Sequence, residues 1–146
     1  MSKFKKYFYI FLPIILGSIV GFIIKDYIDY QYINKPLFAP PKILFPIVWS
    51  IIYLLLGISY YLFKRDNGVS KFYYVQLFFN YLWSILFFVF KFRKLSIFWI
   101  IALLIFLILM LIEFRKVNKT SFRLNILYLV WTVFATYLTI GIYVLN

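Results

Sequence analysis

Five runs without a single charged residue constrain this chain more than any other feature. Each run has 18 to 22 residues, close to the roughly 20 that a helix needs to cross the hydrocarbon core of a bilayer. They cover Tyr7–Ile24, Ile43–Phe63, Phe72–Phe90, Leu95–Ile112 and Leu124–Leu145. The runs are too long and too continuously apolar for barrel strands, and helices satisfy their own backbone groups in lipid. The sequence therefore predicts an all-α integral membrane protein, a five-transmembrane-helix bundle.

Composition supports this prediction. The chain is 66% hydrophobic and only 14% charged, whereas an ordinary soluble domain is about 25% charged. The net charge of +12 is spread over every connection between the runs. Anchoring of these cations at anionic lipid headgroups explains that pattern better than nucleic-acid binding does. We expect one domain over residues 1–146, embedded in the lipid bilayer.

The distribution of Lys and Arg predicts an orientation. Ten of them fall on the side of the N-terminus and six on the opposite side. The positive-inside rule then favours a cytoplasmic N-terminus, and we expect a multi-pass protein of the cell membrane. The first run resembles a signal peptide in its basic flank, but no small-x-small cleavage site follows Ile24, so we assign it to a helix.

The membrane runs offer little conventional chemistry. They contain no ionisable acid, base or histidine, and the whole chain lacks Cys and His. A proton relay or a metal site is disfavoured, and the sequence predicts no cofactor. No hydrolytic triad, phosphate loop or acid–base pair is present, which disfavours a conventional enzyme. A ligand would be bound by shape, stacking and neutral hydrogen bonds.

Neutral polar and aromatic residues are patterned on three of the runs. In the third run, Gln76, Asn80 and Trp83 share one helix face. The second run carries Trp49 and Tyr53 on a further face. The fifth run carries a stripe of hydroxyl groups along one face, namely Tyr128, Thr132, Thr136, Thr139 and Tyr143. Two interpretations stay open for these stripes: hydrogen bonds that tie helices together, and the lining of a pocket.

A stiff basic loop leads into the second run, in the stretch KPLFAPPKILFPIVW from Lys35 to Trp49. Pro36, Pro40 and Pro41 fix several φ angles, which lowers the entropy cost of ordering this loop as a lid. Lys35 and Lys42 place cations at the lid, where the carboxylates of a ligand could sit.

Three sequence elements resemble one membrane family. They are the KPxxxPP stretch after Asn34, the QLFFNYLW stretch from Gln76 to Trp83 and the WTVFAT stretch from Trp131 to Thr136. Together with the number and order of the runs, they resemble the TspO/MBR family, whose members are called translocator protein, peripheral-type benzodiazepine receptor or tryptophan-rich sensory protein. The resemblance covers the chain from about Asn34 to Asn146.

The resemblance implies a five-helix bundle, often a homodimer, with a pocket between helices that the first loop caps. It implies binding of porphyrins and haem-type tetrapyrroles, and of synthetic isoquinoline and benzodiazepine ligands, in tetrapyrrole transport, sensing or regulation. The pocket positions that it implies are Trp49, Gln76, Asn80, Trp83, Trp131, Ala135 and Leu138. The residue patterns add Lys35, Pro40, Pro41 and Tyr53 to this candidate site.

Two alternatives remain beside tetrapyrrole binding. Trp49 and Trp131 match positions implicated, in some relatives, in light-dependent porphyrin degradation, and a scaffold acting through partner proteins is a third reading. The chain also departs from the family pattern at Asp29, Phe38, Ile101 and Thr139. No basic residue follows Tyr143, so a sterol-binding motif is incomplete and sterol binding is disfavoured.

Overall fold

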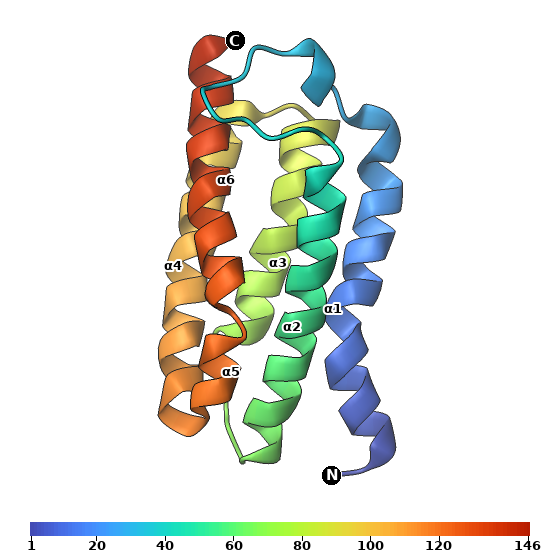
Figure 1. Cartoon of the computed structure of the whole chain (residues 1–146), viewed down its shortest axis with the longest axis vertical. Helices are drawn as coiled ribbons and strands as arrows, with labels where there is room; N and C mark the ends of the chain where they lie inside the picture. The colour runs from blue at the N-terminus through green and yellow to red at the C-terminus, as the bar shows by residue number, and fades with distance from the viewer.

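The structure, a computed structural model of residues 1–146, consists of helices and their connections (Figure 1). A long helix precedes the proline-rich loop, and six helical segments, one of them a π-helical turn, follow it. The bounds are α1 Lys3–Ile24, α2 Leu44–Arg65, α3 Tyr73–Ser84, a π-helical turn Ile85–Val89, α4 Arg93–Val117, α5 Lys119–Arg123 and α6 Ile126–Leu145. We call residues 25–43, between α1 and α2, the lid.

The predicted five-helix membrane bundle is confirmed. Four helices are long and apolar enough to cross a membrane, and α3 with its π-helical turn forms a shorter fifth of 17 residues, at the lower limit for a span. Boundaries shift by a few residues at several ends. The N-terminal helix begins at Lys3 because Ser2 caps it, accepting a hydrogen bond of 3.2 Å from the backbone N–H of Lys5.

The fifth predicted run is preceded by a separate short helix. Asn118 caps α5 by accepting a 3.0 Å hydrogen bond from the N–H of Ser121. Two turn residues, Leu124 and Asn125, then separate α5 from α6. The prediction that one helix starts at Leu124 therefore missed a short turn of helix on its N-terminal side.

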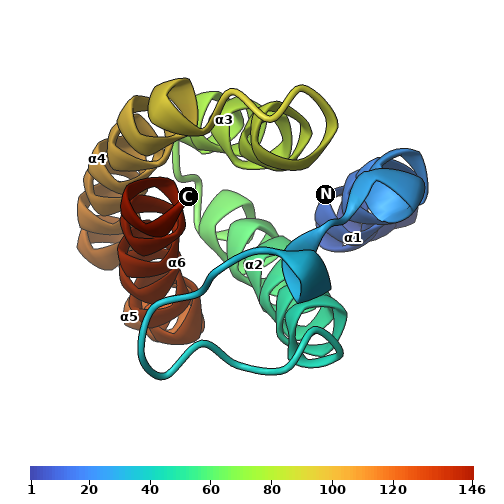
Figure 2. The ribbon, with the colours of Figure 1, turned by 90° about the horizontal axis from the view of Figure 1, so that it is seen from above.

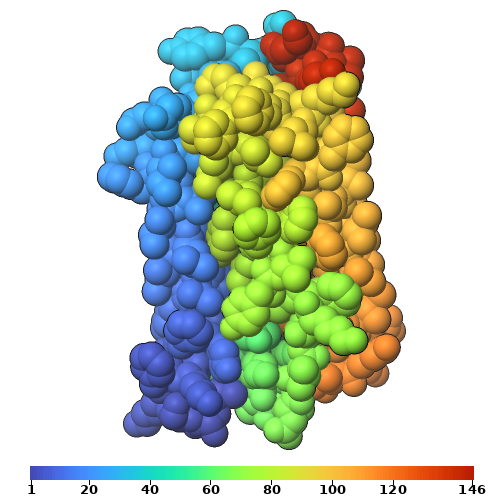
Figure 3. Space-filling view, turned by 180° about the vertical axis from the view of Figure 1, so that it is seen from behind, coloured from blue at the N-terminus to red at the C-terminus, as the bar shows by residue number.

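Seen from above, the helices follow the order α1, α2, α6, α4 and α3 around the bundle (Figure 2). The lid crosses one end, the same end at which α4 starts and α6 finishes (Figure 1). From behind, α3 lies between α1 and α4 (Figure 3). The N-terminus and the α2–α3 and α4–α5 connections lie at the far end, so the lid faces the side that carries fewer basic residues.

A single glycine sets the closest approach of α1 to α2. A Cβ atom added at Gly57 would overlap the carbonyl group of Ile10, so only a residue without a side chain allows this contact. Ring packing continues the contact toward the far end, where Tyr9 meets Tyr60 edge-on at a centroid distance of 5.1 Å. The α1–α2 pair is thus closed at this level.

Polar side chains fasten the connections at the far end. Asn118 donates a 2.7 Å hydrogen bond to Asp66, and Arg65 donates one of 3.2 Å to the same carboxylate. The bond from Asn118 and then that from Arg65 lower the pKa of Asp66. Glu113 of α4 accepts hydrogen bonds from the Ser70 hydroxyl and the Lys71 backbone N–H, at 2.6 and 2.8 Å. These contacts hold the α2–α3 connection against α4 and the start of α5.

Candidate ligand cavity beneath the lid

A cavity of about 590 Å³ opens beneath the lid. Its walls come from the second half of α1, the first half of α2, the end of α3 with its π-helical turn, and the lid itself. The volume lies within the range of roughly 300–1,000 Å³ that is usual for small-molecule sites. A cavity whose walls are mostly apolar suits a largely apolar ligand.

Aromatic side chains form much of the wall. Trp49 and Tyr53 stack one turn apart on α2, with ring centroids 5.5 Å apart, and Trp83 lines the cavity from α3. Tyr30 of the lid packs edge-on against Phe45 at 5.0 Å. The structure therefore brings together three predicted site residues, Trp49, Tyr53 and Trp83, around one space.

The π-helical turn shapes this wall from the side of α3. The backbone N–H of Phe90 bonds to the carbonyl of Ile85, five residues back, in place of the α-helical spacing. Ser84 and Phe88, at and within this turn, both line the cavity. A change of helical pitch thus sets which side chains of the short third helix face the ligand space.

The α1 wall carries two glycines that differ in their surroundings. A Cβ atom at Gly17 would lie 2.5 Å from the ring of Tyr53, so this glycine makes room for a wall residue. Gly21 has no atom within 4 Å of such a Cβ and opens onto the cavity. Both glycines therefore belong to the cavity wall, Gly17 against Tyr53 of α2 and Gly21 against open space.

Cations stand at the mouth of the cavity. Lys25, at the end of α1, and Lys42, at the end of the lid, are both exposed and both line it. Lys35 lies elsewhere: its Nζ donates to the carbonyls of Tyr30 and Ile33, at 2.9 and 3.1 Å, and sits 4.9 Å from the Tyr30 ring centroid. Pairing of Lys35 with a ligand stays a prediction, and it requires this ammonium to leave the two carbonyls.

The lid is folded around Tyr30. The hydroxyl of Tyr30 donates a 2.6 Å hydrogen bond to the carbonyl of Pro40, and the ring is only 5% exposed. Pro40 thereby fixes the tyrosine that lines the cavity, while Pro41 accepts a 3.0 Å bond from the N–H of Leu44, where α2 starts. These two predicted residues act on the cavity through the backbone, and neither lines it.

Polar contacts with the start of α4 and the end of α6 hold the lid to the rest of the bundle. Asp29 accepts hydrogen bonds of 2.7 Å at both carboxylate oxygens from one nitrogen of Arg93, at the start of α4. Asn146, at the end of α6, exchanges hydrogen bonds with the backbone of Asn34 at 3.1 and 2.8 Å. Because these contacts lie on different helices, the lid is held across the bundle end rather than at one point.

The lid also lies close along α6. Tyr137 donates a 2.7 Å hydrogen bond to the carbonyl of Leu37, and the ring of Pro36 approaches Gly141 so closely that a Cβ there would lie 2.6 Å from it. Phe38 turns the chain back with a φ of 68°, a left-handed conformation uncommon for a bulky residue. Phe38 is 80% exposed and points away from the core.

The two carboxamides of α3 form an interhelical network. Tyr53 of α2 donates to Asn80 Oδ1 at 2.6 Å, and Asn80 Nδ2 donates to the hydroxyl of Tyr128, on α6, at 2.8 Å. That hydroxyl donates to Gln76 Oε1 at 2.6 Å, and Gln76 Nε2 donates to the carbonyl of Tyr73 at 2.8 Å. Gln76 and Asn80 are fully buried behind the cavity wall, and Tyr53 connects them to it.

The threonine stripe does not tie helices together. Thr132, Thr136 and Thr139 each donate to the carbonyl four residues earlier in α6, at 2.7 to 2.8 Å. The interhelical interpretation is wrong for these three hydroxyls, because a threonine in a helix can satisfy its own donor within the preceding turn.

The remaining predicted residues lie on α6, one layer behind the cavity. Trp131 packs edge-on against Phe45 at 5.8 Å, and its Nε1 is buried without a hydrogen-bond partner. Ala135 and Leu138 are buried, at 3% and 4% exposure. None of the three lines the cavity, so their contact with a ligand stays a prediction.

Comparison with known proteins agrees with this architecture. The family model described as "TspO/MBR family" matches residues 9–145. The chain belongs to the TspO/MBR family. It is 38% identical over 122 residues to "Tryptophan-rich protein TspO" of Archaeoglobus fulgidus, covering 80% of this chain and 79% of that protein.

Two further relatives extend the comparison. A "Tryptophan-rich protein TspO" of Chlorobaculum tepidum is 34% identical over 125 residues, covering 80% of this chain and 78% of the relative. The "Tryptophan-rich sensory protein" of Cereibacter sphaeroides is 28% identical over 110 residues, covering 73% of this chain and 70% of the relative. This member of the TspO/MBR family is accordingly a multi-pass integral membrane protein.

Sequence reasoning missed several wall residues of this TspO/MBR member. Phe45 could have been found, because it precedes Trp49 by four residues on one face of α2. Tyr30 and Lys25 carried no such signal, since the fold of the lid decides which of its residues turn inward. The departure at Asp29 has a clear role here, because its carboxylate holds the lid to Arg93.

Proposed function

We propose that the protein binds a porphyrin or haem-type tetrapyrrole in the cavity beneath the lid, and acts in tetrapyrrole transport, sensing or regulation at the membrane. One observation carries this proposal: the cavity joins an aromatic wall, with Trp49, Tyr53 and Trp83, to two cations at its mouth, Lys25 and Lys42. Few ligand classes combine a large flat apolar body with acidic groups on one edge. Tetrapyrroles with propionate side chains do.

The chemistry of each part suits such a ligand. A flat π-system gains from stacking on, or packing edge-on against, aromatic side chains. Burial of the macrocycle removes apolar area from water at about 25 cal/mol per Å². Carboxylates at the mouth stay near water and meet Lys25 and Lys42. Trp83 Nε1 is buried without a partner within the chain, so it remains a donor that a ligand acceptor can use.

The names of relatives support a role in sensing. The relative from Cereibacter sphaeroides is named a "Tryptophan-rich sensory protein". The lid is bonded to two helices, and Tyr30, which lines the cavity, lies next to Asp29 in the chain. A ligand that displaces Tyr30 therefore also strains the Asp29–Arg93 ion pair. We infer that ligand occupancy is reported through the position of the lid.

Quenching of tryptophan fluorescence by porphyrin tests the proposal. We expect saturable quenching that falls most in Trp49→Phe and Trp83→Phe, the two tryptophans that line the cavity. Trp131→Phe should have a smaller effect because Phe45 separates it from the cavity. Trp99→Phe is the matched control, since Trp99 donates to the carbonyl of Phe79, on α3, and lies outside the cavity. Quenching lost equally in all four variants would place the porphyrin in the lipid rather than in the cavity.

Light-dependent degradation of the bound porphyrin is the second candidate. It is favoured by the position of Trp49, whose indole forms part of the wall. We place binding first because the other tryptophan invoked for that chemistry, Trp131, lies behind Phe45. Illumination of the complex distinguishes the two: loss of porphyrin absorbance that depends on Trp49 supports degradation, and stable absorbance supports binding alone.

A further inference from the structure

We propose that a second site, on the outer surface at the lid end of α4, binds the headgroup of an anionic membrane phospholipid. A shallow pocket of about 740 Å³ lies there between the start of α4 and the end of α6. It shares no lining residue with the cavity beneath the lid. The proposal therefore stands independently of tetrapyrrole binding.

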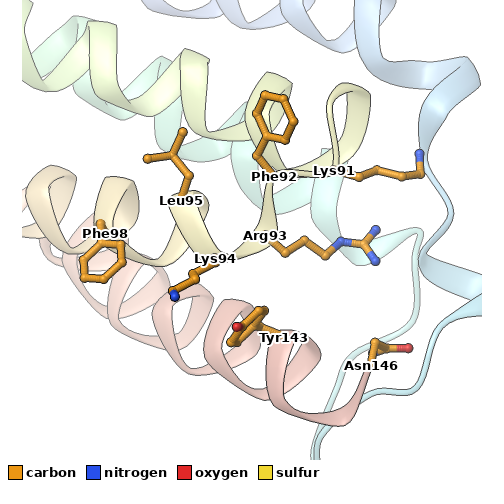
Figure 4. Close-up of a pocket in the computed structure, with 8 residues that line it drawn as sticks. All are labelled: Lys91, Phe92, Arg93, Lys94, Leu95, Phe98, Tyr143 and Asn146. Carbon is orange, nitrogen blue, oxygen red and sulfur yellow. The ribbon is translucent and has the colours of Figure 1, made fainter.

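Charge is the first argument. Three basic residues within four positions line the pocket, Lys91, Arg93 and Lys94 (Figure 4). Arg93 is neutralised by Asp29, with both carboxylate oxygens at 2.7 Å. Lys91 donates only to backbone carbonyls, at 3.0 and 3.4 Å, and Lys94 has no hydrogen bond or ion pair within the chain. The pocket thus carries two positive charges that no acidic side chain compensates.

Position in the membrane is the second argument. The α4 span starts at Arg93, so Lys94 lies where the chain enters the apolar region. Leu95 and Phe98 line the same pocket and are 45% and 63% exposed. Three residues apart on a helix, they face the same way. A phosphate placed at Lys94 would let acyl chains run down past Leu95 and Phe98.

The opposite wall offers polar groups at the same level. Tyr143 and Asn146 line the pocket from α6, and Figure 4 shows Lys94 and Tyr143 on facing sides of the space between the two helices. The hydroxyl of Tyr143 has no partner within the chain, and its ring is 42% exposed. A cation and a free hydroxyl on facing helices can hold the two sides of one phosphodiester.

The combination of cations, a hydroxyl and apolar side chains in one pocket distinguishes a lipid-binding site from diffuse attraction between surface lysines and anionic lipids. Scattered lysines at a membrane surface attract any anionic lipid without fixing it. Here unpaired cations, a free hydroxyl and exposed apolar side chains line one pocket between two membrane helices. A zwitterionic headgroup would bring its own ammonium to the lysines, so we infer a preference for phosphatidylglycerol over phosphatidylcholine.

Native mass spectrometry of the detergent-solubilised protein tests this inference by counting bound lipids. Phosphatidylglycerol and phosphatidylcholine with identical acyl chains are titrated separately. We expect tighter retention of phosphatidylglycerol, and a loss of about two- to fivefold in its affinity in Lys94→Gln, the range for one exposed ion pair. Lys94→Arg should retain the preference, and Tyr143→Phe should weaken it.

The matched control is Lys116→Gln, which removes one positive charge from the opposite end of the same helix, at an exposed residue that lines neither pocket. It should leave phosphatidylglycerol binding unchanged. Equal losses in Lys116→Gln and Lys94→Gln would overturn the site in favour of diffuse surface attraction. Displacement of the lipid by inorganic phosphate at millimolar concentration would also overturn it, because the site would then recognise a free anion. Lys94 is exposed, and unchanged helicity by circular dichroism verifies folding of each variant.

Discussion

Near the N-terminus of α1, Gly57 of α2 lets the backbone of Ile10 lie against α2, and aromatic rings fill the remaining space. Eleven residues further along α1, which is about three turns, Gly21 has no atom within 4 Å and faces the cavity. The same residue type closes one end of the pair and opens the other. The two glycines differ in what lies opposite them: the backbone of the other helix at Gly57, and open space at Gly21.

The comparison shows how an uncharged helix pair can hold both a core and a binding site. The closed end keeps α1 in place, since α1 otherwise contributes one buried residue, Pro13. The open end is bounded by large rings that lean on one another, among them Trp49 and Tyr53. Changes at the closed end should therefore act on stability, and changes at the open end on the ligand.

Gly21→Leu is expected to have the largest effect. A Cβ at this position meets no protein atom, and the larger side chain enters the cavity. It should therefore reduce porphyrin affinity by about a hundredfold, roughly 2.7 kcal/mol, while stability holds. Porphyrin titration with tryptophan fluorescence measures the first and thermal unfolding in detergent the second. Ile19→Leu, a neighbouring residue that is 52% exposed, is the control and should change neither. Full affinity in Gly21→Leu would locate the ligand elsewhere.

Gly57→Ala should act in the opposite sense. Its Cβ overlaps the carbonyl of Ile10, and α1 must shift, which we expect to cost about 1–3 kcal/mol of unfolding free energy, as overpacking does elsewhere. Denaturant unfolding in detergent measures the loss. An unchanged transition would show that α1 can move away from α2 freely, and the contrast between the two ends would disappear.

Asn80→Leu tests the interhelical hydrogen-bond network behind the cavity wall. The substitution leaves the hydroxyl of Tyr53 and an acceptor site on Tyr128 without their partner, and should lower stability by about 0.6–1.7 kcal/mol, the span measured for intramembrane hydrogen bonds. Affinity of the folded fraction should hold, since Asn80 lies behind the wall. A selective loss of affinity would instead assign Asn80 to the ligand.

The smallest effect is expected at the mouth. Lys42→Ala should weaken a dicarboxylic porphyrin by up to about 1 kcal/mol, leave its dimethyl ester and uncharged isoquinoline ligands unaffected, and lose this selectivity in high salt. Lys35→Ala is the comparison, measured in the same titrations. Because Lys35 holds loop carbonyls, it should weaken acid and ester alike. A loss confined to the acid would establish its predicted contact with the ligand.

Much of the membrane architecture could be predicted from composition alone. An uncharged run of about 20 residues has few choices in lipid, where its backbone must bond to itself. The aromatic wall was predictable in part, because Trp49 and Tyr53 are one turn apart on one face. The partners of Gln76 and Asn80 were not, because a buried carboxamide bonds equally well to a ligand or to another helix. Asn80 bonds to other helices because Tyr53 of α2 and Tyr128 of α6 lie within hydrogen-bond distance of it.

By itself, the sequence determined the five membrane helices, the proline-rich loop and the family. Those features depend on local properties: hydrophobic length, proline geometry and the order of motifs along one chain. Only the tertiary structure decided that Lys35 turns into the lid while Lys25 and Lys42 stand at the cavity, and that α1 forms one wall. These outcomes depend on which distant backbones approach one another. Among apolar helices, small differences in side-chain packing decide which backbones approach. The spacing of residues along the chain does not reveal these differences.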